Sequence, residues 1–277
     1  MIEAVPGDKP QRARLVRAEN PGVLTLEGTN TWILAEPGAD KCVIVDPGPD
    51  DSTHVSEVLS ALEQWELTAA LILVTHGHED HAGAIDALFD ATSAPVRALD
   101  RRWCRGTMPV LPDERITVEG LELQVLATPG HTQDSMSVLC PIDGALVTGD
   151  TVLGGGSSLV AWPDGQLGPY LESLQELRKL AAAGLALYLL PGHGPQVPNA
   201  LTAIDTLLAH RVLRLQQVRD VLDDGASTIA DVIDRVYGLP GPALQDAVVN
   251  QVKAQLEYLA ARGESRAAVA MATESAS

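Results

Sequence analysis

The segment His76–His81 carries three histidines and an aspartate within six residues, directly after the short apolar run Ala70–Val74. A short run rich in leucine and β-branched residues is typical of a buried strand. The cluster therefore falls at the end of a strand, where the backbone leaves the sheet and side chains from several loops can converge. Imidazole and carboxylate ligands together suit a divalent ion of zinc's borderline character. The segment predicts a metal site at the edge of a sheet.

Three later residues, His131, Asp150 and His193, stand in the same context. Each follows an apolar, strand-like run and has glycine close beside it. Glycine lets the backbone turn sharply, so the neighbouring side chain can point off the sheet edge. Any one of these residues alone could equally be a turn residue in a glycine-rich loop, but the repeated context favours a shared site. Four strand ends then deliver five histidines and two aspartates, which is too many ligands for one tetrahedral ion and suits two.

The order of these residues resembles that of the metallo-β-lactamase superfamily, whose signature is His-x-His-x-Asp-His followed by separate His, Asp and His ligands. The residues that match the signature are His76, His78, Asp80, His81, His131, Asp150 and His193. The true lactamases of this fold usually replace some of these ligands, often by cysteine, whereas no cysteine lies near a ligand position in this chain. The complete set is more similar to the hydrolytic di-zinc branches, which include glyoxalase II, nucleases and related thioesterases.

The resemblance also implies two divalent metal ions as cofactors and a role for each ligand. The first two histidines of the signature and His131 are expected to hold one ion. Asp80, His81 and His193 are expected to hold the second, and Asp150 to bridge both. Zinc is the expected metal, although manganese or iron suits the same ligands. Two ions about 3.5–4 Å apart can share a water and lower its pKa toward about 7, which yields a bridging hydroxide as nucleophile. Asp80 is the expected catalytic residue, because in the family it orients that hydroxide.

The rest of the sequence alternates short strand-like runs with amphipathic helical stripes, which by itself indicates a mixed α/β chain. Short strand-like runs lie within residues 13–46 and at residues 96–99, 121–127, 135–139 and 145–148. Ser52 is the expected N-cap of a first helix, and a second helix is expected over 82–90. The layer order comes from the resemblance, which implies an αββα sandwich of two sheets between helices. We expect this catalytic domain to cover residues 1–198.

Three amphipathic stripes predict a small C-terminal helical module over residues 199–263, with Ser227 as the cap of its second helix. Residues 225–263 contain three basic and four acidic side chains. The module therefore suits a structural lid or a homodimer surface better than nucleic-acid contact. Residues 264–277 are rich in alanine, serine and glutamate without a period, so we expect a disordered tail.

Stretches outside the ligands, led by Gly28–Thr31 and Pro191–Pro195, resemble the β-lactamase-like protein 2 branch. That branch is similar to single-strand endoribonucleases and carries a small winged-helix-like module at its C-terminus. On this resemblance the leading hypothesis is a di-metal hydrolase that cleaves phosphodiesters in short single-stranded RNA. The alternative is a thioesterase similar to glyoxalase II or to acyl-carrier thioesterases, acting on a small-molecule ester or thioester. A metal-binding scaffold protein is the non-enzyme alternative.

Charge, hydropathy and cysteine content limit the expected partners and cellular location of the protein. The formal net charge of −18 argues against an extended nucleic-acid surface. No apolar run approaches about 18–20 residues, so no membrane-spanning helix is expected, and residues 1–17 lack the pattern of a signal peptide. Cys42, Cys104 and Cys140 are odd in number and widely spaced, which favours reduced, buried thiols in a cytoplasmic protein.

Several residues near the expected site are candidate substrate contacts. The candidates are Asn30, Gly155, Trp162 and Tyr170. Asn30 could instead bond the neighbouring metal loop or stabilise its own turn. The glycine run around Gly155 could cradle an anion through its backbone N–H groups, and a flexible surface loop is an equal alternative.

Two further histidines lie outside the ligand set. His54 stands near the start of the first helix, and we expect it to be an exposed bystander. His210 stands beside Arg211, Arg214 and Arg219 on the long helix of the C-terminal module. This group could contact a phosphate, but a solvated helix face is the favoured interpretation.

Overall fold

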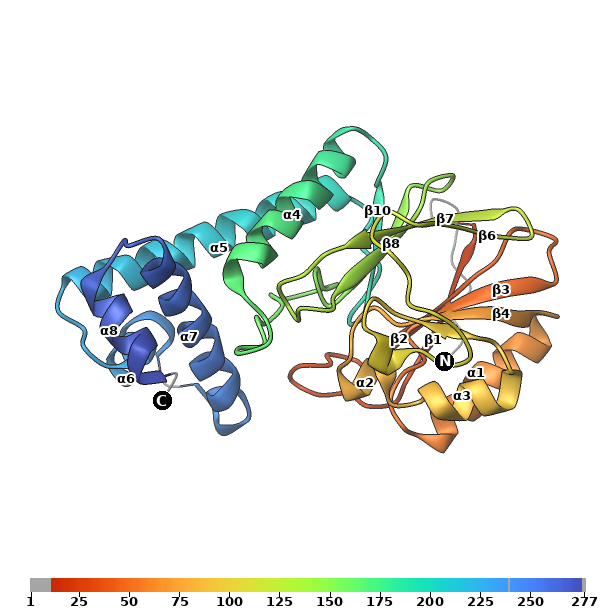
Figure 1. The fold of residues 1–277 in the computed structure, drawn as a ribbon, viewed down its shortest axis with the longest axis horizontal. Helices are drawn as coiled ribbons and strands as arrows, with labels where there is room; N and C mark the ends of the chain where they lie inside the picture. Colours follow the sequence, from red (N-terminus) through yellow and green to blue (C-terminus); the bar gives the residue numbers. More distant parts are fainter. Residues whose placement is uncertain (1–10, 239, 276–277) are drawn as a thin grey trace.

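Two five-stranded sheets pack face to face between outer helices in the computed structural model, which describes residues 11–238 and 240–275 (Figure 1). The first sheet has the order β1-β2-β3-β4-β5, antiparallel from β1 to β3 and parallel from β3 to β5. Its strands are β1 (Ala13–Arg17), β2 (Asn30–Leu34), β3 (Lys41–Val45), β4 (Thr68–Leu73) and β5 (Val96–Arg97). The parallel pairing brings the carboxyl ends of β3 and β4 to the same edge, where the histidine cluster begins.

The second sheet has the order β10-β9-β8-β7-β6 and is antiparallel except for the parallel pair of β9 and β10. Its strands are β6 (Arg115–Val118), β7 (Leu121–Ala127), β8 (Met136–Cys140), β9 (Ala145–Gly149) and β10 (Tyr188–Pro191). The sequence patterns predict all of these strands except β6. This edge strand holds four residues in which polar and apolar side chains alternate, so it lacks the continuous apolar run that marks the central strands.

The apolar core is divided into layers by the alternation of side chains along each strand. Val138 of β8 and Val147 of β9 lie in the core between the two sheets, together with Val45 of the first sheet. The neighbouring Leu139 and Leu146 point the other way, into the core under the outer helices. Strands β8 and β9 are therefore buried on both faces, which explains why their sequences are continuously apolar.

Helices α1 (Ser52–Gln64), α2 (Glu79–Ala82) and α3 (Ile85–Thr92) cover the outer face of the first sheet (Figure 1). Asp51 caps α1, because its side chain accepts a hydrogen bond from the Thr53 N–H group at 2.7 Å. The prediction of Ser52 as N-cap was wrong by one residue. The helix predicted over 82–90 is two helices, because the chain turns at Gly83 and Ala84 between them. The 3₁₀ helix η1 (Arg101–Trp103) follows β5.

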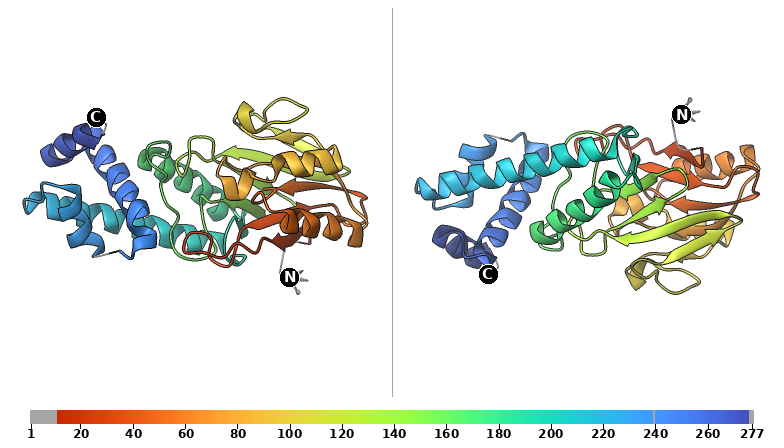
Figure 2. Two further views of the ribbon diagram at one scale, coloured as in Figure 1. Left: turned by 90° about the horizontal axis from the view of Figure 1, so that it is seen from below. Right: turned by 90° about the horizontal axis from the view of Figure 1, so that it is seen from above.

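Helix α4 (Leu167–Ala182) covers the outer face of the second sheet, and α5 (Ala200–Asp223) packs against α4. This completes the expected αββα layers. Figure 2 shows that α5 continues beyond the sandwich and carries a helical lobe at its far end. The other elements of this lobe are α6 (Ile229–Tyr237), the 3₁₀ helix η2 (Pro242–Leu244), α7 (Gln245–Ala261) and α8 (Arg266–Ser275). One apolar cluster runs from Leu146 in the sheet to Leu256 in α7, so the division at residues 198 and 199 stays a prediction.

The lobe differs from expectation in three ways. Within the described part of residues 199–275 all regular elements are helical, so no β-wing accompanies the helices. Thr228, and not Ser227, caps α6 through a capping box with Asp231. The tail expected to be disordered forms α8 over 266–275, with Ala268 and Met271 buried against the lobe. Alanine has the highest helix propensity of all residues, which an argument from missing periodicity overlooks. Residues 276–277 lie outside the described part of the chain.

Candidate metal centre

Loops at the ends of four strands bring the predicted ligands to one place. Three groups of residues each have ligand atoms within 4.8 Å of one another. The groups are His76, His78 and His131; Asp80, His81 and His193; and His76, His81 and Asp150. The loop after β4 and the first turn of α2 supply the signature residues, and the loops after β7, β9 and β10 supply the rest. All seven residues singled out from the sequence therefore converge.

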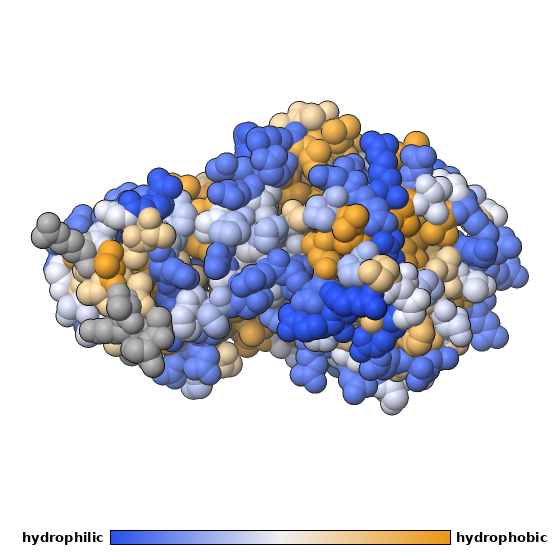
Figure 3. Space-filling view, viewed as in Figure 1, coloured by the Kyte–Doolittle hydropathy of each residue, from blue (hydrophilic) through white to orange (hydrophobic). Residues whose placement is uncertain are grey.

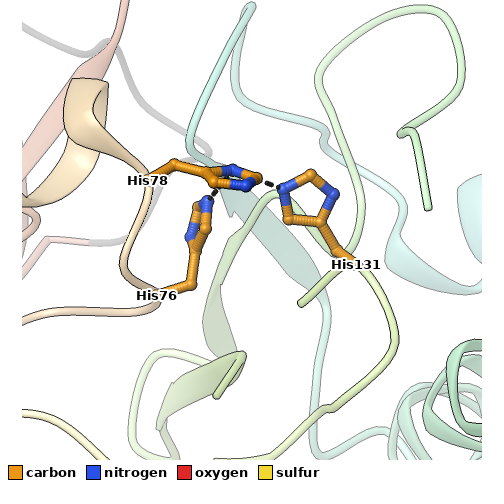
Figure 4. Close-up of side chains that lie close together, drawn as sticks. All are labelled: His76, His78 and His131. Atoms are coloured by element: carbon orange, nitrogen blue, oxygen red, sulfur yellow. Dashed lines mark hydrogen bonds between the residues drawn. The ribbon is translucent and has the colours of Figure 1, made fainter. Parts of the chain in front are cut away.

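The first group has the spacing of a tetrahedral ligand set (Figure 4). The Nδ1 atom of His78 lies 3.0 Å from Nε2 of His76 and 3.0 Å from Nε2 of His131. Zinc–nitrogen bonds of about 2.0–2.1 Å in tetrahedral geometry place neighbouring ligand nitrogens about 3.3 Å apart. Figure 4 shows the three rings directed at one another from separate loops. These two separations are therefore close to the spacing that a tetrahedral zinc ion requires.

The second group is built around His193. Its Nε2 atom lies 3.2 Å from Nε2 of His81 and 3.1 Å from Oδ2 of Asp80. Asp150 lies between the two groups, with Oδ1 3.4 Å from His81 Nε2 and Oδ2 3.7 Å from His131 Nε2. Oδ1 of Asp150 is buried and has no hydrogen-bond partner among the described residues. A buried carboxylate oxygen without a donor is costly, and a cation between the two groups would satisfy it.

The outer ring nitrogens fix how the histidines present their lone pairs. Nδ1 of His131 lies 2.6 Å from the carbonyl oxygen of Leu159, and Nδ1 of His193 lies 3.3 Å from that of Gly28. A carbonyl oxygen only accepts, so each Nδ1 carries a hydrogen, and in the neutral ring each Nε2 keeps its lone pair for the cluster. Nδ1 of His81 faces the Asp46 carboxylate at 2.8 Å, with the same consequence.

The hydrogen on the His76 ring is also placed on Nδ1, through contacts with Thr75 and Asp46. The Thr75 hydroxyl donates to Oδ2 of Asp46 at 2.8 Å, so it can only accept from Nδ1 of His76, which lies 3.1 Å away. Nε2 of His76 is then a lone-pair donor as well. In their neutral form, four of the five histidines therefore direct an Nε2 lone pair into one small volume. Such lone pairs repel unless a cation lies among them, so the donor set fits divalent metal ions of the zinc type.

The two ligand groups differ in the pKa values of their histidines. Burial lowers the pKa of His76 well below its usual value and that of His131 to about 4, so both rings are neutral at pH 7. Burial also opposes a charge on His193, but its contacts with Asp150 and Asp80 outweigh burial and raise its pKa to about 9. The carboxylates therefore attract positive charge to the second group.

Asp46 supports the site, although the sequence pattern indicates only that it ends a strand-like stretch. Its carboxylate is 1% exposed and accepts hydrogen bonds from the Thr75 N–H group at 2.7 Å, from the Thr75 hydroxyl and from His81. It thereby orients ligands on both sides of the cluster. The available signal was its position at the end of the strand adjacent to β4, since parallel neighbours end at the same edge.

Asn30 holds the loop that carries His193. The Asn30 side chain is fully buried, and Nδ2 donates to the carbonyl oxygens of Pro191 at 2.9 Å and Gly194 at 2.8 Å. Of the alternatives considered for Asn30, the structure therefore supports the bond to the neighbouring metal loop. Its prediction as a substrate contact was wrong, because the side chain has no exposed surface.

A cleft of about 570 Å³ lies directly over the cluster. It is lined by ligands on its floor, by Val23 to Leu26 on one side, by the loop from Leu153 to Ala161, and by Asp246, Ala247 and Asn250 of α7. The predicted contact Gly155 lines this cleft. No pattern in the sequence indicates that α7, far from the ligands along the chain, contributes to the wall.

The two aromatic candidates do not line the cleft. Tyr170 is fully buried, and its hydroxyl donates to the carbonyl oxygen of Thr151 at 2.8 Å. Trp162 packs against the helical core and holds the Lys253 ammonium 4.3 Å above its ring. Both predictions were wrong because these rings fill the space under α4 and α7. His54 was expected to be exposed but is 2% exposed and lies 2.9 Å from the Thr31 hydroxyl, since α1 packs on the first sheet.

Comparison with known proteins agrees with this geometry. Residues 24–193 match the model of the metallo-beta-lactamase superfamily, and the chain belongs to this superfamily of metal-dependent hydrolases. It is 32% identical to a beta-lactamase-like protein 2 homolog of Caenorhabditis elegans over 90% of this chain and 84% of the relative. It is 30% identical to the lactamase-like protein vrtG of Penicillium aethiopicum, over 92% and 78%.

Solved structures show the same fold. A beta-lactamase domain protein from Burkholderia ambifaria superposes with a TM-score of 0.79, at 20% identity, over 95% of this chain and 90% of that one. The match extends well beyond residue 193, so the fold similarity includes C-terminal helices. In the described part of this chain, no helix is long and apolar enough to span a membrane.

Proposed function

We propose that this chain is a di-zinc hydrolase that cleaves an ester or thioester whose acyl group is largely apolar. His76, His78 and His131 would hold one ion, and Asp80, His81 and His193 the other. Asp150, which lies within 3.7 Å of ligand nitrogens from both groups, would bridge them. The ions would supply Lewis acidity, which lowers the pKa of a coordinated water toward about 7 and offsets charge that develops on the attacked carbonyl.

The protein's own side chains orient the attacking water and keep bulk water away from the reacting carbonyl. Asp80 lies at the cleft floor with Oδ2 3.1 Å from His193 and 3.4 Å from the Thr29 hydroxyl. Those two contacts hold its carboxylate in one orientation. It can therefore accept a hydrogen bond from the attacking water and hold the proton that this water loses. The apolar side walls, among them Leu26, Leu153 and Val160, keep bulk water from the reacting carbonyl.

The side chains that line the cleft are the observation on which the proposed substrate rests. Eight of its lining side chains are valine, leucine or alanine, and none is lysine or arginine. Two acidic residues outside the ligand set, Glu79 and Asp246, lie at the rim. A phosphodiester chain needs cations along its path. An uncharged acyl group instead gains from burial against these walls, at roughly 25 cal/mol per Å².

The basic residues of α5 do not supply the missing cations. Arg211 is 4% exposed and donates to the Ser158 carbonyl oxygen and to Gln251 Oε1. Arg214 donates to the Val236 carbonyl oxygen at 2.9 Å, and Arg219 pairs with Glu264. These guanidinium groups bind α5 to the loop after β9 and to other parts of the lobe. Figure 3 shows a face on which hydrophilic residues predominate between hydrophobic patches. The formal net charge of the chain is −18, so acidic residues outnumber basic ones. The structure therefore favours the ester or thioester over single-stranded RNA.

A substrate panel tests the proposal. Zinc-loaded protein is offered decanoyl and acetyl thioesters, p-nitrophenyl decanoate, bis(p-nitrophenyl) phosphate and a short single-stranded RNA, each with and without chelator. We expect chelator-sensitive cleavage of the esters and thioesters. The His78→Ala variant should remain folded while losing one of two zinc ions and nearly all turnover. Cleavage of RNA alone would overturn the substrate assignment, and turnover of none with two ions bound would favour a scaffold protein.

A further inference from the structure

A second cavity of about 520 Å³ lies on the other side of the loop Val152–Ser157 from the metal cleft. Leu153, Gly155, Gly156 and Ser157 line both spaces. Helix α5 forms the far wall of the second cavity through residues that include Ala203, Leu207 and His210. The loop, which is exposed at Gly155 and Gly156, is therefore a partition between the metal cleft and an open pocket that contains no ligand of the cluster.

The partition is anchored at one residue and open at the next two. A Cβ atom on Gly154 would lie 2.2 Å from the Pro195 carbonyl oxygen, so this residue packs directly on the backbone that follows His193. A Cβ on Gly155 would have its nearest neighbour at 3.9 Å, and one on Gly156 would have none within 4 Å. At these two residues the wall between the cavities is a single stretch of backbone without side chains. A ligand can pass over it without displacing a packed group.

Apolar residues form most of the second cavity, and Ser157, Thr206 and His210 are its polar side chains. The Thr206 hydroxyl already donates to the Thr202 carbonyl oxygen at 2.7 Å. Val152, Val197 and Leu207 supply apolar walls. The Ser157 hydroxyl and Nδ1 of His210 are buried atoms that have no hydrogen-bond partner among the described residues. Burial, with Arg211 and Arg214 nearby, lowers the pKa of His210, so its ring is neutral at pH 7. Apolar walls with a few convergent polar groups are typical of small-molecule sites of about 300–1,000 Å³. Neutral polar groups suit a neutral partner and not a phosphate.

We propose that the second cavity binds the distal part of the substrate's acyl chain, which crosses the partition at Gly155 and Gly156. Ser157 and His210 then hydrogen-bond a neutral oxygen substituent on that chain, such as a hydroxyl or keto group. This inference rests on the proposed ester or thioester hydrolysis, because the scissile carbonyl must lie at the metals while the chain extends away. It assigns a substrate class: acyl groups too long for the metal cleft alone, with a polar group remote from the reacting carbon.

A matched pair of variants on α5 tests the assignment. Ala203→Phe adds a ring to the wall of the second cavity, whereas Ala209→Phe adds the same ring to an exposed position of the same helix that lines neither cavity. The measured quantity is the ratio of kcat/KM for decanoyl to acetyl thioester. We expect Ala203→Phe to lower this ratio at least tenfold and Ala209→Phe to leave it within twofold. An unchanged ratio in Ala203→Phe, with zinc content and circular dichroism preserved, would overturn the inference and leave the proposed hydrolysis standing.

The role of the polar side chains is tested separately by substrate preference. A binding measurement tests the cavity even if the proposed hydrolysis is not observed. His210→Leu should abolish any preference of the wild type for a hydroxydecanoyl over a decanoyl thioester. If no ester or thioester is cleaved, the proposed function fails, and binding of uncleavable decanamide is measured by calorimetry instead. Binding that Ala203→Phe weakens at least tenfold and Ala209→Phe does not would still support the cavity assignment. Absent binding, or equal binding by both variants, would sink it.

Discussion

Substitution of Asp46 by asparagine isolates the support that this buried carboxylate gives to the metal ligands. Oδ1 accepts from the Thr75 N–H group, and Oδ2 accepts from the Thr75 hydroxyl and from His81 Nδ1. An amide of the same shape can accept only through its oxygen. In either orientation its NH₂ group faces a donor, so at least one of these hydrogen bonds is lost and a buried donor remains unpaired. The variant keeps the volume of the side chain, so packing is not the variable.

The size of the effect follows from that loss. A buried donor without its partner costs about 1–3 kcal/mol, and removing an outer partner of a metal-bound histidine typically weakens metal binding about 10- to 100-fold. Since tenfold in affinity is about 1.4 kcal/mol, the two figures agree. We expect Asp46→Asn to bind its more weakly held zinc about 10- to 100-fold less tightly and to lose turnover in proportion.

The assay is zinc competition against a chromophoric chelator at pH 7, with urea unfolding of the same samples. Asp90→Asn is the matched control, because Asp90 is exposed at the far end of α3. The control should retain wild-type affinity. If Asp46→Asn bound both ions within twofold of the wild type, the inference that this carboxylate fixes His81 and His76 through hydrogen bonds would be refuted.

Two further predictions concern close packing at the site and the thiols. In Gly192→Ala the added Cβ would lie 2.5 Å from Cε1 of His81 and 2.6 Å from Oδ1 of Asp150. Because shifts near 1 Å in reacting groups lower the rate about 100-fold, we expect turnover to fall by that factor. In the control Gly241→Ala the added Cβ meets nothing within 4 Å, so turnover in the same assay should stay near wild type. Burial raises the pKa of Cys42 to about 12, so Ellman's reagent at pH 8 should label only the half-buried Cys104 rapidly in the folded chain, and a second rapid equivalent would contradict this.

The ligand set was visible in the sequence because metal chemistry restricts it. Few residue types bind zinc, and the segment His76–His81 places several of them at the end of an apolar strand. The later ligands repeat the same combination of strand, glycine and polar side chain. Local pattern therefore predicted the strand ends, and the requirement of a common cation predicted that they meet. All of the seven side chains lie in the groups that the structure brings together.

Contacts between segments far apart along the chain were decided only by the folded structure. Tyr170 has the same local pattern whether it lines a cleft or lies under Arg211, and the packing of α4 against α5 selects the second. Asn30 bonds carbonyl groups that follow it by more than 160 residues. The cleft wall from α7 depends on how the lobe folds back over the loop after β9.

The physical reason for this division is the range of the interactions. Propensity, periodicity and ligand identity act within a few residues, so the amino-acid sequence alone specifies every strand except β6, most helices and the metal-binding side chains. Which carboxylate orients a ligand, which ring is buried and which helix closes a cavity depend on tertiary packing. These choices are made by volumes and hydrogen-bond partners that only the assembled layers define.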